Sequence, residues 1–159
     1  MIKKIPAETP YYHFYNANPK DRRTGDCLIR ALAVALGKSW DDVVDDLVAI
    51  AHKTKYTIGE QRNYEQYLKS NDYTIEKQPK HEDNTKLTGE ELCRLLDYRH
   101  MTKPVLANIG ADHIVVFAKI DGRYKIHDIW NCQRYKIGKV YIHHDDIQNY
   151  YNIRKVNTW

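Results

Sequence analysis

Residues 113–130 read HIVVFAKIDGRYKIHDIW, and this segment decides the fold that the sequence predicts. Its first half, residues 113–120, is an almost unbroken run of apolar and β-branched residues. Such a run is typical of a central strand that is covered on both faces of its sheet. The dipeptide Asp121-Gly122 is a strong signal for a tight turn, and residues 123–130 form the returning strand. The segment therefore predicts an antiparallel hairpin at the centre of a sheet.

The chain upstream of this hairpin is mostly helical by its pattern. Apolar residues recur at three- and four-residue steps after Cys27, and Gly37 ends that helix. Ser39 is a good cap for a second helix, and Thr88 with Glu91 forms a capping box for a later one. The predicted helices cover residues 27–37, 39–51, 60–70 and 88–99, and the other predicted strands cover residues 73–76, 105–109 and a pair within 134–142 that turns at Gly138. Helices come first and an antiparallel sheet second, so the predicted fold class is α+β.

Length and composition indicate an ordinary globular protein. The 159 residues suggest a single domain, residues 1–159, in which residues 1–23 form an extended arm rich in proline and tyrosine. No apolar run approaches the roughly 20 residues that a membrane helix needs, and the N-terminus lacks the apolar core of a signal peptide. We therefore expect a cytoplasmic protein.

Charge and cysteine content argue against two further classes of protein. The net charge of +4 comes from interleaved basic and acidic residues, so nucleic-acid binding is not indicated. The three cysteines, Cys27, Cys93 and Cys132, are widely spaced and form no C-x-x-C motif. This pattern favours a reducing compartment over a disulfide framework.

Three residues have the types and positions that cysteine catalysis needs. Cys27 starts the first helix, whose positive end favours a thiolate and offers unpaired N–H groups. His113 opens the most hydrophobic strand and is the candidate base. Asp128 lies nearly symmetric to His113 about the hairpin turn, so the hairpin brings a carboxylate beside the imidazole. Trp130 lies on the same face as Asp128 and is placed to shield that contact from water. We predict a Cys-His-Asp triad.

These motifs together resemble those of the papain-like cysteine peptidases, most closely the compact C39-like peptidases of bacteria and phages. The matching stretches are Asp26-Cys27, the KPVLA strand of residues 103–107, HIVVF from His113, and the D-x-W of Asp128 and Trp130. The resemblance implies a helical half that carries the cysteine, packed on an antiparallel sheet that carries the histidine and the aspartate. The GDCLIRAL stretch is also similar to the cysteine motif of ovarian-tumour-type deubiquitinases.

The resemblance also implies an activity. Cys27 would attack the carbonyl of a peptide or isopeptide bond in a protein substrate and form a thioester acyl-enzyme. His113 would be the general base and acid, and Asp128 would orient it. No metal or organic cofactor is expected.

One departure from the family leaves alternatives open. Papain-like peptidases carry a glutamine shortly before the cysteine as an oxyanion donor, and PKDRRTGDC contains none. Asn18, Arg22, Thr24 or backbone groups are the available substitutes. One alternative is a transglutaminase-like, deamidating or acyl-transferring enzyme with the same triad. Another is an inactive papain-like fold that binds a protein, encoded by a phage and acting on a host protein.

The other cysteines and histidines have simpler interpretations. Cys93 lies on an apolar helix face and is expected in the core, whereas Cys132 follows Trp130 in a turn and is expected to be partly exposed and without a role. A metal site is conceivable, but its spacings match no ligand pattern. Its candidate ligands are His127, His143, His144, Asp145 and Asp146.

Overall fold

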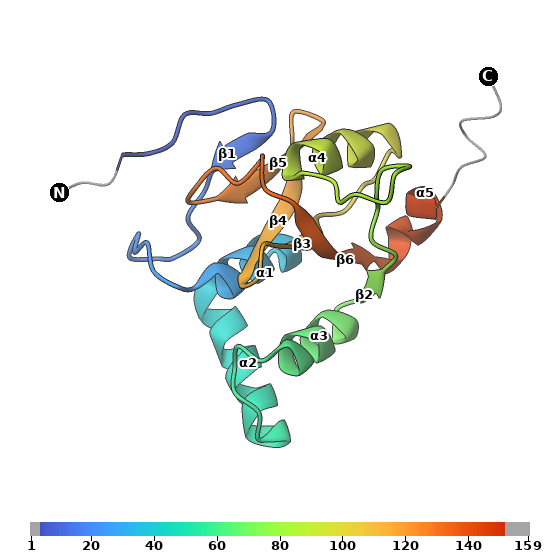
Figure 1. Ribbon diagram of the computed structural model, residues 1–159. Coiled ribbons are helices and arrows are strands. Elements are labelled where there is room, and N and C mark those ends of the chain that lie inside the picture. The colour runs from blue at the N-terminus through green and yellow to red at the C-terminus, as the bar shows by residue number, and fades with distance from the viewer. Residues whose placement is uncertain (1–3, 152–159) are drawn as a thin grey trace.

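The computed structural model describes residues 4–151, which form a six-stranded sheet with helices on both faces (Figure 1). The helices are α1 (Cys27–Leu36), α2 (Trp40–Thr54), α3 (Gln61–Ser70), α4 (Gly89–Tyr98) and α5 (Ile147–Tyr151), with a short 3-10 helix η1 (His144–Asp146). The strands are β1 (Tyr12–Phe14), β2 (Tyr73–Glu76), β3 (Val105–Ile109), β4 (His113–Ile120), β5 (Arg123–Asp128) and β6 (Ile137–His143). The α+β class is as predicted.

The β4–β5 hairpin forms where the sequence predicts it. Ile120 pairs with Arg123, so the turn consists of two residues. Asp121 and Gly122 have φ angles of +52° and +79°. Positive φ at both central residues is the geometry of the tight hairpin turn that matches strand twist, and aspartate and glycine adopt it readily. Five consecutive residues of β4 are buried, as expected for a central strand.

The sheet is mixed, whereas the sequence predicted an antiparallel one. Its strand order is β1-β5-β4-β3-β6-β2. β1 comes from the predicted N-terminal arm and pairs in parallel with β5, with Tyr12 opposite Ile126. The other pairs are antiparallel. Because β1 has only three residues, it carries no alternation from which its pairing could be predicted.

Gly138 is not the turn that the sequence predicted. It lies inside β6, which runs unbroken from Ile137 and pairs with both β3 and β2. The register with β3 shifts between Ala107 and Ile109, so the chain bulges there. A Cβ added at Gly138 would lie 3.5 Å from the Cβ of Asn108, the residue inside this shift. The glycine therefore marks a β-bulge, which also interrupts the alternation of a strand.

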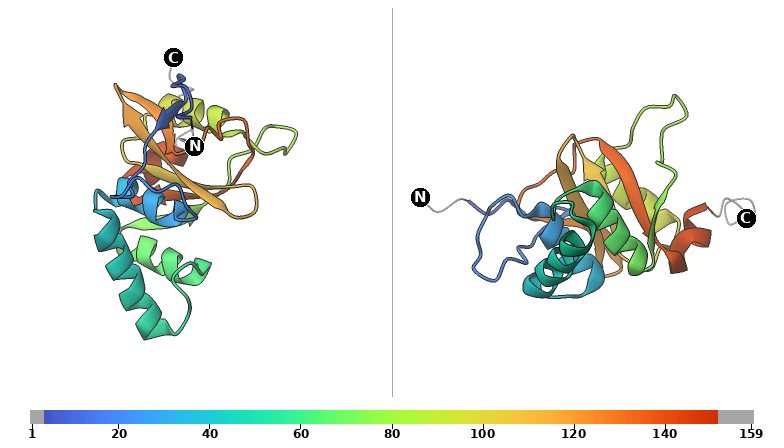
Figure 2. Two further views of the ribbon diagram at one scale, coloured as in Figure 1. Left: turned by 90° about the vertical axis from the view of Figure 1, so that its left-hand side faces the viewer. Right: turned by 90° about the horizontal axis from the view of Figure 1, so that it is seen from below.

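Two separate cores lie on the two faces of the sheet. Val115 and Phe117 of β4 face the core that includes α4, and Ile114 and Val116 face the core that includes α1, α2 and α3. Figure 2 shows α2 and α3 as a projecting pair on that second side. β4 thus contributes apolar residues to both faces, which explains its nearly continuous apolar run.

The helix ends follow the local signals in the sequence. Gly37 ends α1 in the left-handed region with φ of 62°. The side chain of Ser39 accepts a hydrogen bond from the Asp42 N–H, and that of Thr88 accepts one from the Glu91 N–H. Within residues 4–151, no helix is long and apolar enough to cross a membrane.

Asp146 joins η1 to the segment that leads into β3. Its side chain is fully buried. The carboxylate accepts hydrogen bonds from the Thr102 N–H at 3.0 Å, the Thr102 hydroxyl at 2.7 Å and the Lys103 N–H at 2.7 Å. Without Asp146 these donors would have no carboxylate partner, and a buried donor without an acceptor is costly.

We predict that Asp146→Ala lowers the free energy of unfolding by about 3 kcal/mol, because it removes a fully buried carboxylate that accepts hydrogen bonds from Thr102 and Lys103. Urea denaturation measures this change. Asp145→Ala is the matched control, since Asp145 is exposed and its ion pair with Lys103 spans 3.8 Å. Its effect should stay below about 0.5 kcal/mol. Equal effects of the two variants would contradict this role of Asp146.

Candidate active site

Cys27 is the first residue of α1, as predicted, and its side chain is half-buried. Asp26 precedes it as the N-cap, although the Asp26 side chain does not cap the helix. The N–H groups of a first helical turn have no partner within the helix. The sulfur therefore lies at the positive end of α1, where a thiolate and other negative charge are stabilised.

His113 and Asp128 meet at the open end of the β4–β5 hairpin. Asp128 follows His127, which pairs with Val116, so Asp128 is a diagonal neighbour of His113 on the same face. The Nε2 atom of His113 lies 2.6 Å from the Oδ2 atom of Asp128. This short contact orients the imidazole and leaves Nδ1 for another partner. The hairpin thus brings together the two residues that the sequence assigned to the triad.

The N-terminal arm fixes the backbone of Asp128. Tyr12 of β1 donates its hydroxyl to the Asp128 carbonyl at 3.0 Å, and the Tyr15 N–H donates to the same carbonyl at 3.1 Å. The arm therefore supports the orienting carboxylate from outside the hairpin.

The titration properties of Cys27 and His113 are coupled. Burial raises the pKa of the Cys27 thiol, but hydrogen bonding to His113, aided by the backbone of Ile114 and the charge of Arg30, brings the pKa below its ordinary value of 9.0. Burial lowers the pKa of His113, yet its hydrogen bonds to Asp128, Cys132 and Cys27 raise the pKa to about 11. Each group thus favours the charged form of the other.

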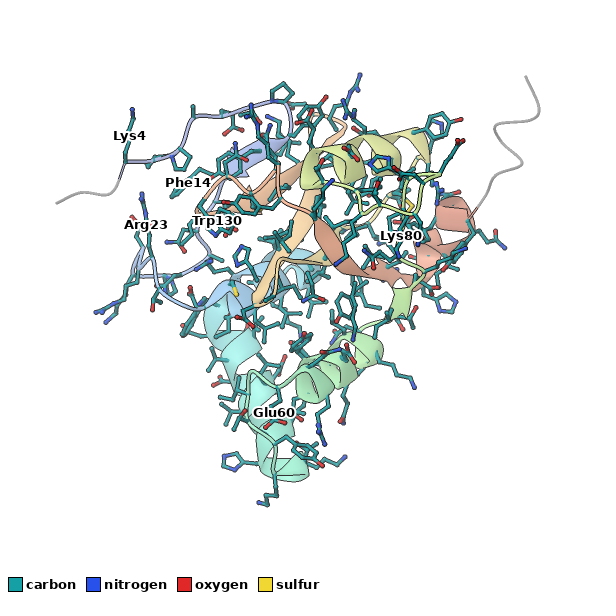
Figure 3. All side chains as sticks on the ribbon, in the orientation of Figure 1. Lys4, Phe14, Arg23, Glu60, Lys80 and Trp130 are labelled. Atoms are coloured by element: carbon teal, nitrogen blue, oxygen red, sulfur yellow. The ribbon has the colours of Figure 1, made fainter. Side chains whose placement is uncertain are left out.

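Trp130 packs over the imidazole, as the sequence indicated. Its ring centroid lies 4.9 Å from that of His113, and Tyr135 in turn packs edge-on against Trp130 at 5.2 Å. Figure 3 shows Trp130 on the same flank of the molecule as Phe14 and Arg23, far from Glu60 and Lys80. The indole shields the imidazole and its charge partner from solvent.

A buried arginine, Arg30, connects Cys27's helix to Asp128. It is only 5% exposed. Its guanidinium donates to the Thr24 carbonyl at 3.1 Å, to the Asp128 Oδ1 atom at 3.3 Å and to the Asp26 carboxylate. Arg30 was not among the residues predicted for the site. A signal for it is present in the sequence, since it is a lone arginine inside the apolar run CLIRALAVAL, one turn after the cysteine.

Asp26 is the second buried charge that the sequence analysis left without a structural role. Its Oδ2 atom accepts hydrogen bonds from the Asn18 side-chain amide at 3.1 Å and from the Trp40 indole at 2.9 Å. Together with Arg30, these bonds tie the N-terminal arm and the start of α2 to the start of α1. The backbone that carries Cys27 is therefore held from three directions.

The expectation for Cys132 is wrong, whereas that for Cys93 is confirmed. Cys132 is fully buried rather than partly exposed, and it interacts with the imidazole of His113. The chain after Trp130 folds back toward the start of α4, where the Gln133 carbonyl accepts from the Glu90 N–H at 2.8 Å. Cys93 is fully buried in the core beside α4. Burial raises the pKa of both thiols.

Of the residues of the alternative metal site, His143 and Asp145 lie together, with Nδ1 and Oδ2 3.7 Å apart, but His127 lies on another strand. His127 belongs to β5, and its Nε2 atom lies 3.1 Å from the Ala118 carbonyl oxygen. His143 is the last residue of β6, and its ring packs against Tyr73. In the described part of the chain, the group with metal-ligand spacing is instead His113, Asp128 and Cys132. His127 therefore does not form one ligand set with His143 and the residues that follow it.

Comparison of the chain with protein-family models, curated proteins and solved structures finds no match. The site itself has a thiol at a helix start, an imidazole that lowers the pKa of this thiol, and a buried carboxylate in contact with the ring.

We predict that Arg30→Met lowers the free energy of unfolding by about 3–5 kcal/mol, because it leaves Asp26 and Asp128 as buried charges without their cation. Urea denaturation at neutral pH measures the loss. Arg22→Met is the control, since Arg22 is exposed. A variant Arg30→Met as stable as the wild type would show that the two carboxylates do not need the guanidinium.

Proposed function

We propose that this chain is a papain-like cysteine hydrolase with Cys27 as nucleophile, His113 as general base and acid, and Asp128 as the orienting carboxylate. The observation that carries the proposal is the position of the His113 ring. Its Nε2 atom is 2.6 Å from the Oδ2 atom of Asp128, and the interaction of the ring with Cys27 lowers the pKa of the thiol. Such an arrangement supports nucleophilic catalysis at a carbonyl group. The resemblance to papain-like peptidases favours a peptide or isopeptide bond in a protein substrate.

The reaction begins when the Cys27 thiolate attacks the carbonyl carbon and forms a tetrahedral oxyanion. As the oxyanion collapses, the carbon–nitrogen bond breaks and the imidazolium of His113 gives its proton to the leaving amine. Water then attacks the thioester while His113 takes a proton from it, and the carbon–sulfur bond breaks to release the acid product and restore the Cys27 thiolate. Asp128 holds the ring and stabilises the imidazolium.

The oxyanion needs hydrogen-bond donors near the Cys27 sulfur. The backbone N–H of Cys27, at the open end of α1, is one donor of the right kind. Asn18 is the best-placed side chain for the second, because its amide nitrogen donates to Asp26, the residue directly before Cys27. That bond uses one N–H of the amide and leaves the other available. The other candidates, Arg22 and Thr24, are exposed.

We predict that iodoacetamide alkylates Cys27 rapidly at pH 7, below the ordinary thiol pKa, because His113 stabilises the thiolate. In His113→Ala the pKa of Cys27 should rise, and alkylation at pH 7 should slow by about tenfold or more. Peptide mapping of the alkylated protein measures the rate at each cysteine.

Two controls belong to this measurement. His127→Ala removes a histidine outside the site, so Cys27 should react as in the wild type. Cys93 is fully buried and should stay unmodified. Slow and equal alkylation of Cys27 in the wild type and in His113→Ala would refute the catalytic triad.

We predict that Asn18→Ala slows acylation of Cys27 by an activated ester about 10²-fold, because one oxyanion donor is lost. Alkylation by iodoacetamide forms no oxyanion and should keep its rate. Asn149→Ala is the control, since the Asn149 amide donates to the His100 carbonyl at 3.2 Å, outside the site. Equal losses in the rates of acylation and alkylation would assign Asn18 to the folding of the arm.

Mass spectrometry of peptide products separates a cleaving enzyme from a deamidating or cross-linking one.

A further inference from the structure

Three side chains that can bind a metal ion, one of them the imidazole of His113, converge at one point in the site. A ring nitrogen of His113, a carboxylate oxygen of Asp128 and the sulfur of Cys132 all lie within 4.8 Å of one another. Asp128 is 4% exposed and Cys132 is fully buried. Cys132 has no part in the proposed reaction, so its position beside the imidazole calls for its own explanation.

The ligand set fits zinc better than other common metal ions. Zinc prefers thiolate, imidazole and carboxylate ligands at distances of about 2.0–2.3 Å in a tetrahedral arrangement. In such an arrangement two ligand atoms lie about 3.5 Å apart. The three atoms here are already within 4.8 Å, so a shift of less than about 2 Å per pair would bring them to that spacing. Calcium and magnesium prefer oxygen ligands and would not use the thiol.

The surrounding groups leave one side of Asp128 available. Its Oδ1 atom accepts from the Ile129 N–H at 2.7 Å and from Arg30 at 3.3 Å. Oδ2 faces His113 and is the oxygen that a metal ion would share with the ring. Arg30 is a cation beside this carboxylate, but it is also bound by Asp26.

Solvent reaches the cluster through the histidine. The side chain of His113 is 17% exposed, whereas that of Asp128 is 4% exposed. The three ligands would leave one tetrahedral position for water, as in zinc sites with three protein ligands. The bonds of Asp128 to Arg30 and Ile129 would hold that ligand in place from behind.

We propose that His113, Asp128 and Cys132 form a binding site for a zinc-class divalent metal ion. Metal binding displaces the contact between His113 and Asp128, because both groups turn their lone pairs to the ion. Binding itself does not depend on the proposed hydrolase. Inhibition by the metal ion is a consequence that does rest on it, since a metal-bound imidazole cannot act as the base.

Cobalt binding to the full chain tests the site. Co²⁺ is the probe, because a bond between thiolate and cobalt absorbs strongly in the near ultraviolet whereas surface histidines and carboxylates give no such band. The titration uses Cys27→Ser, so that the nucleophile cannot supply the thiolate. We expect one equivalent of Co²⁺ to bind with this absorption, and Zn²⁺ to displace it.

Three further variants follow: Cys132→Ser and His113→Gln test the ligands, and Cys93→Ser is the control. Adding Cys132→Ser should abolish the thiolate absorption and weaken binding by about tenfold or more, since even indirect partners of a metal ligand contribute 10–100-fold. Adding Cys93→Ser should leave both unchanged, because Cys93 lies outside the cluster. Far-ultraviolet circular dichroism shows which variants are folded. Adding His113→Gln, at a position that is 17% exposed, should weaken binding about tenfold or more even if Cys132→Ser does not fold.

Three outcomes would overturn the site. The first is the absence of thiolate absorption when Cys27→Ser is titrated, and the second is absorption that survives in folded Cys27→Ser/Cys132→Ser. Either of these would make Cys132 a core thiol only. The third is an affinity that His113→Gln leaves unchanged, which would remove His113 from the ligand set. The outcome is independent of the alkylation of Cys27, so failure of the metal site and failure of the hydrolase are distinguishable.

Discussion

The structure around Cys27 depends on one buried charge, the guanidinium of Arg30, which lies between the carboxylates of Asp26 and Asp128. Taking three charges out of water is costly, and an arrangement of this kind is stable only when the charges meet with good geometry. Arg30 belongs to the same helix as Cys27, whereas Asp128 belongs to the β4–β5 hairpin. The ion pair therefore sets how α1 lies against the end of the sheet. The packing of α1 on the sheet and the geometry of the candidate site therefore depend on the same contacts.

Much of the fold could be predicted because its signals are local. The turn at Asp121-Gly122 and the caps at Ser39 and Thr88 depend on a few neighbouring residues. The parallel pairing of β1 with β5 could not be predicted in the same way. It joins Tyr12 to Ile126, and nothing in a three-residue strand specifies a partner so far along the chain. Gly138 was misassigned because a glycine marks a bulge inside a strand as readily as a turn between strands.

The residues of the candidate site divide in the same way, into those with a local signal in the sequence and those without one. Cys27, His113 and Asp128 could be named because a helix start and a hairpin turn place them without long-range assumptions. Arg30 and Cys132 could not, since their importance comes from groups that only the folded chain brings to them. A buried arginine is stable here only because two carboxylates from different segments surround it. Sequence patterns show which residues are unusual for their surroundings, but not which distant groups will compensate for them.

The parallel strand β1 has a consequence for the order of events during synthesis. Tyr12 is 116 residues before Asp128, whose carbonyl it binds. The segments of α1, α2 and α3 leave the ribosome early, and their contacts with one another are local. The N-terminal arm must wait for β5, because its strand has no earlier partner. Throughout that interval Cys27 exists without its imidazole and carboxylate. A nascent or truncated chain would thus carry an ordinary thiol, and reactivity would appear only when synthesis of the hairpin is complete.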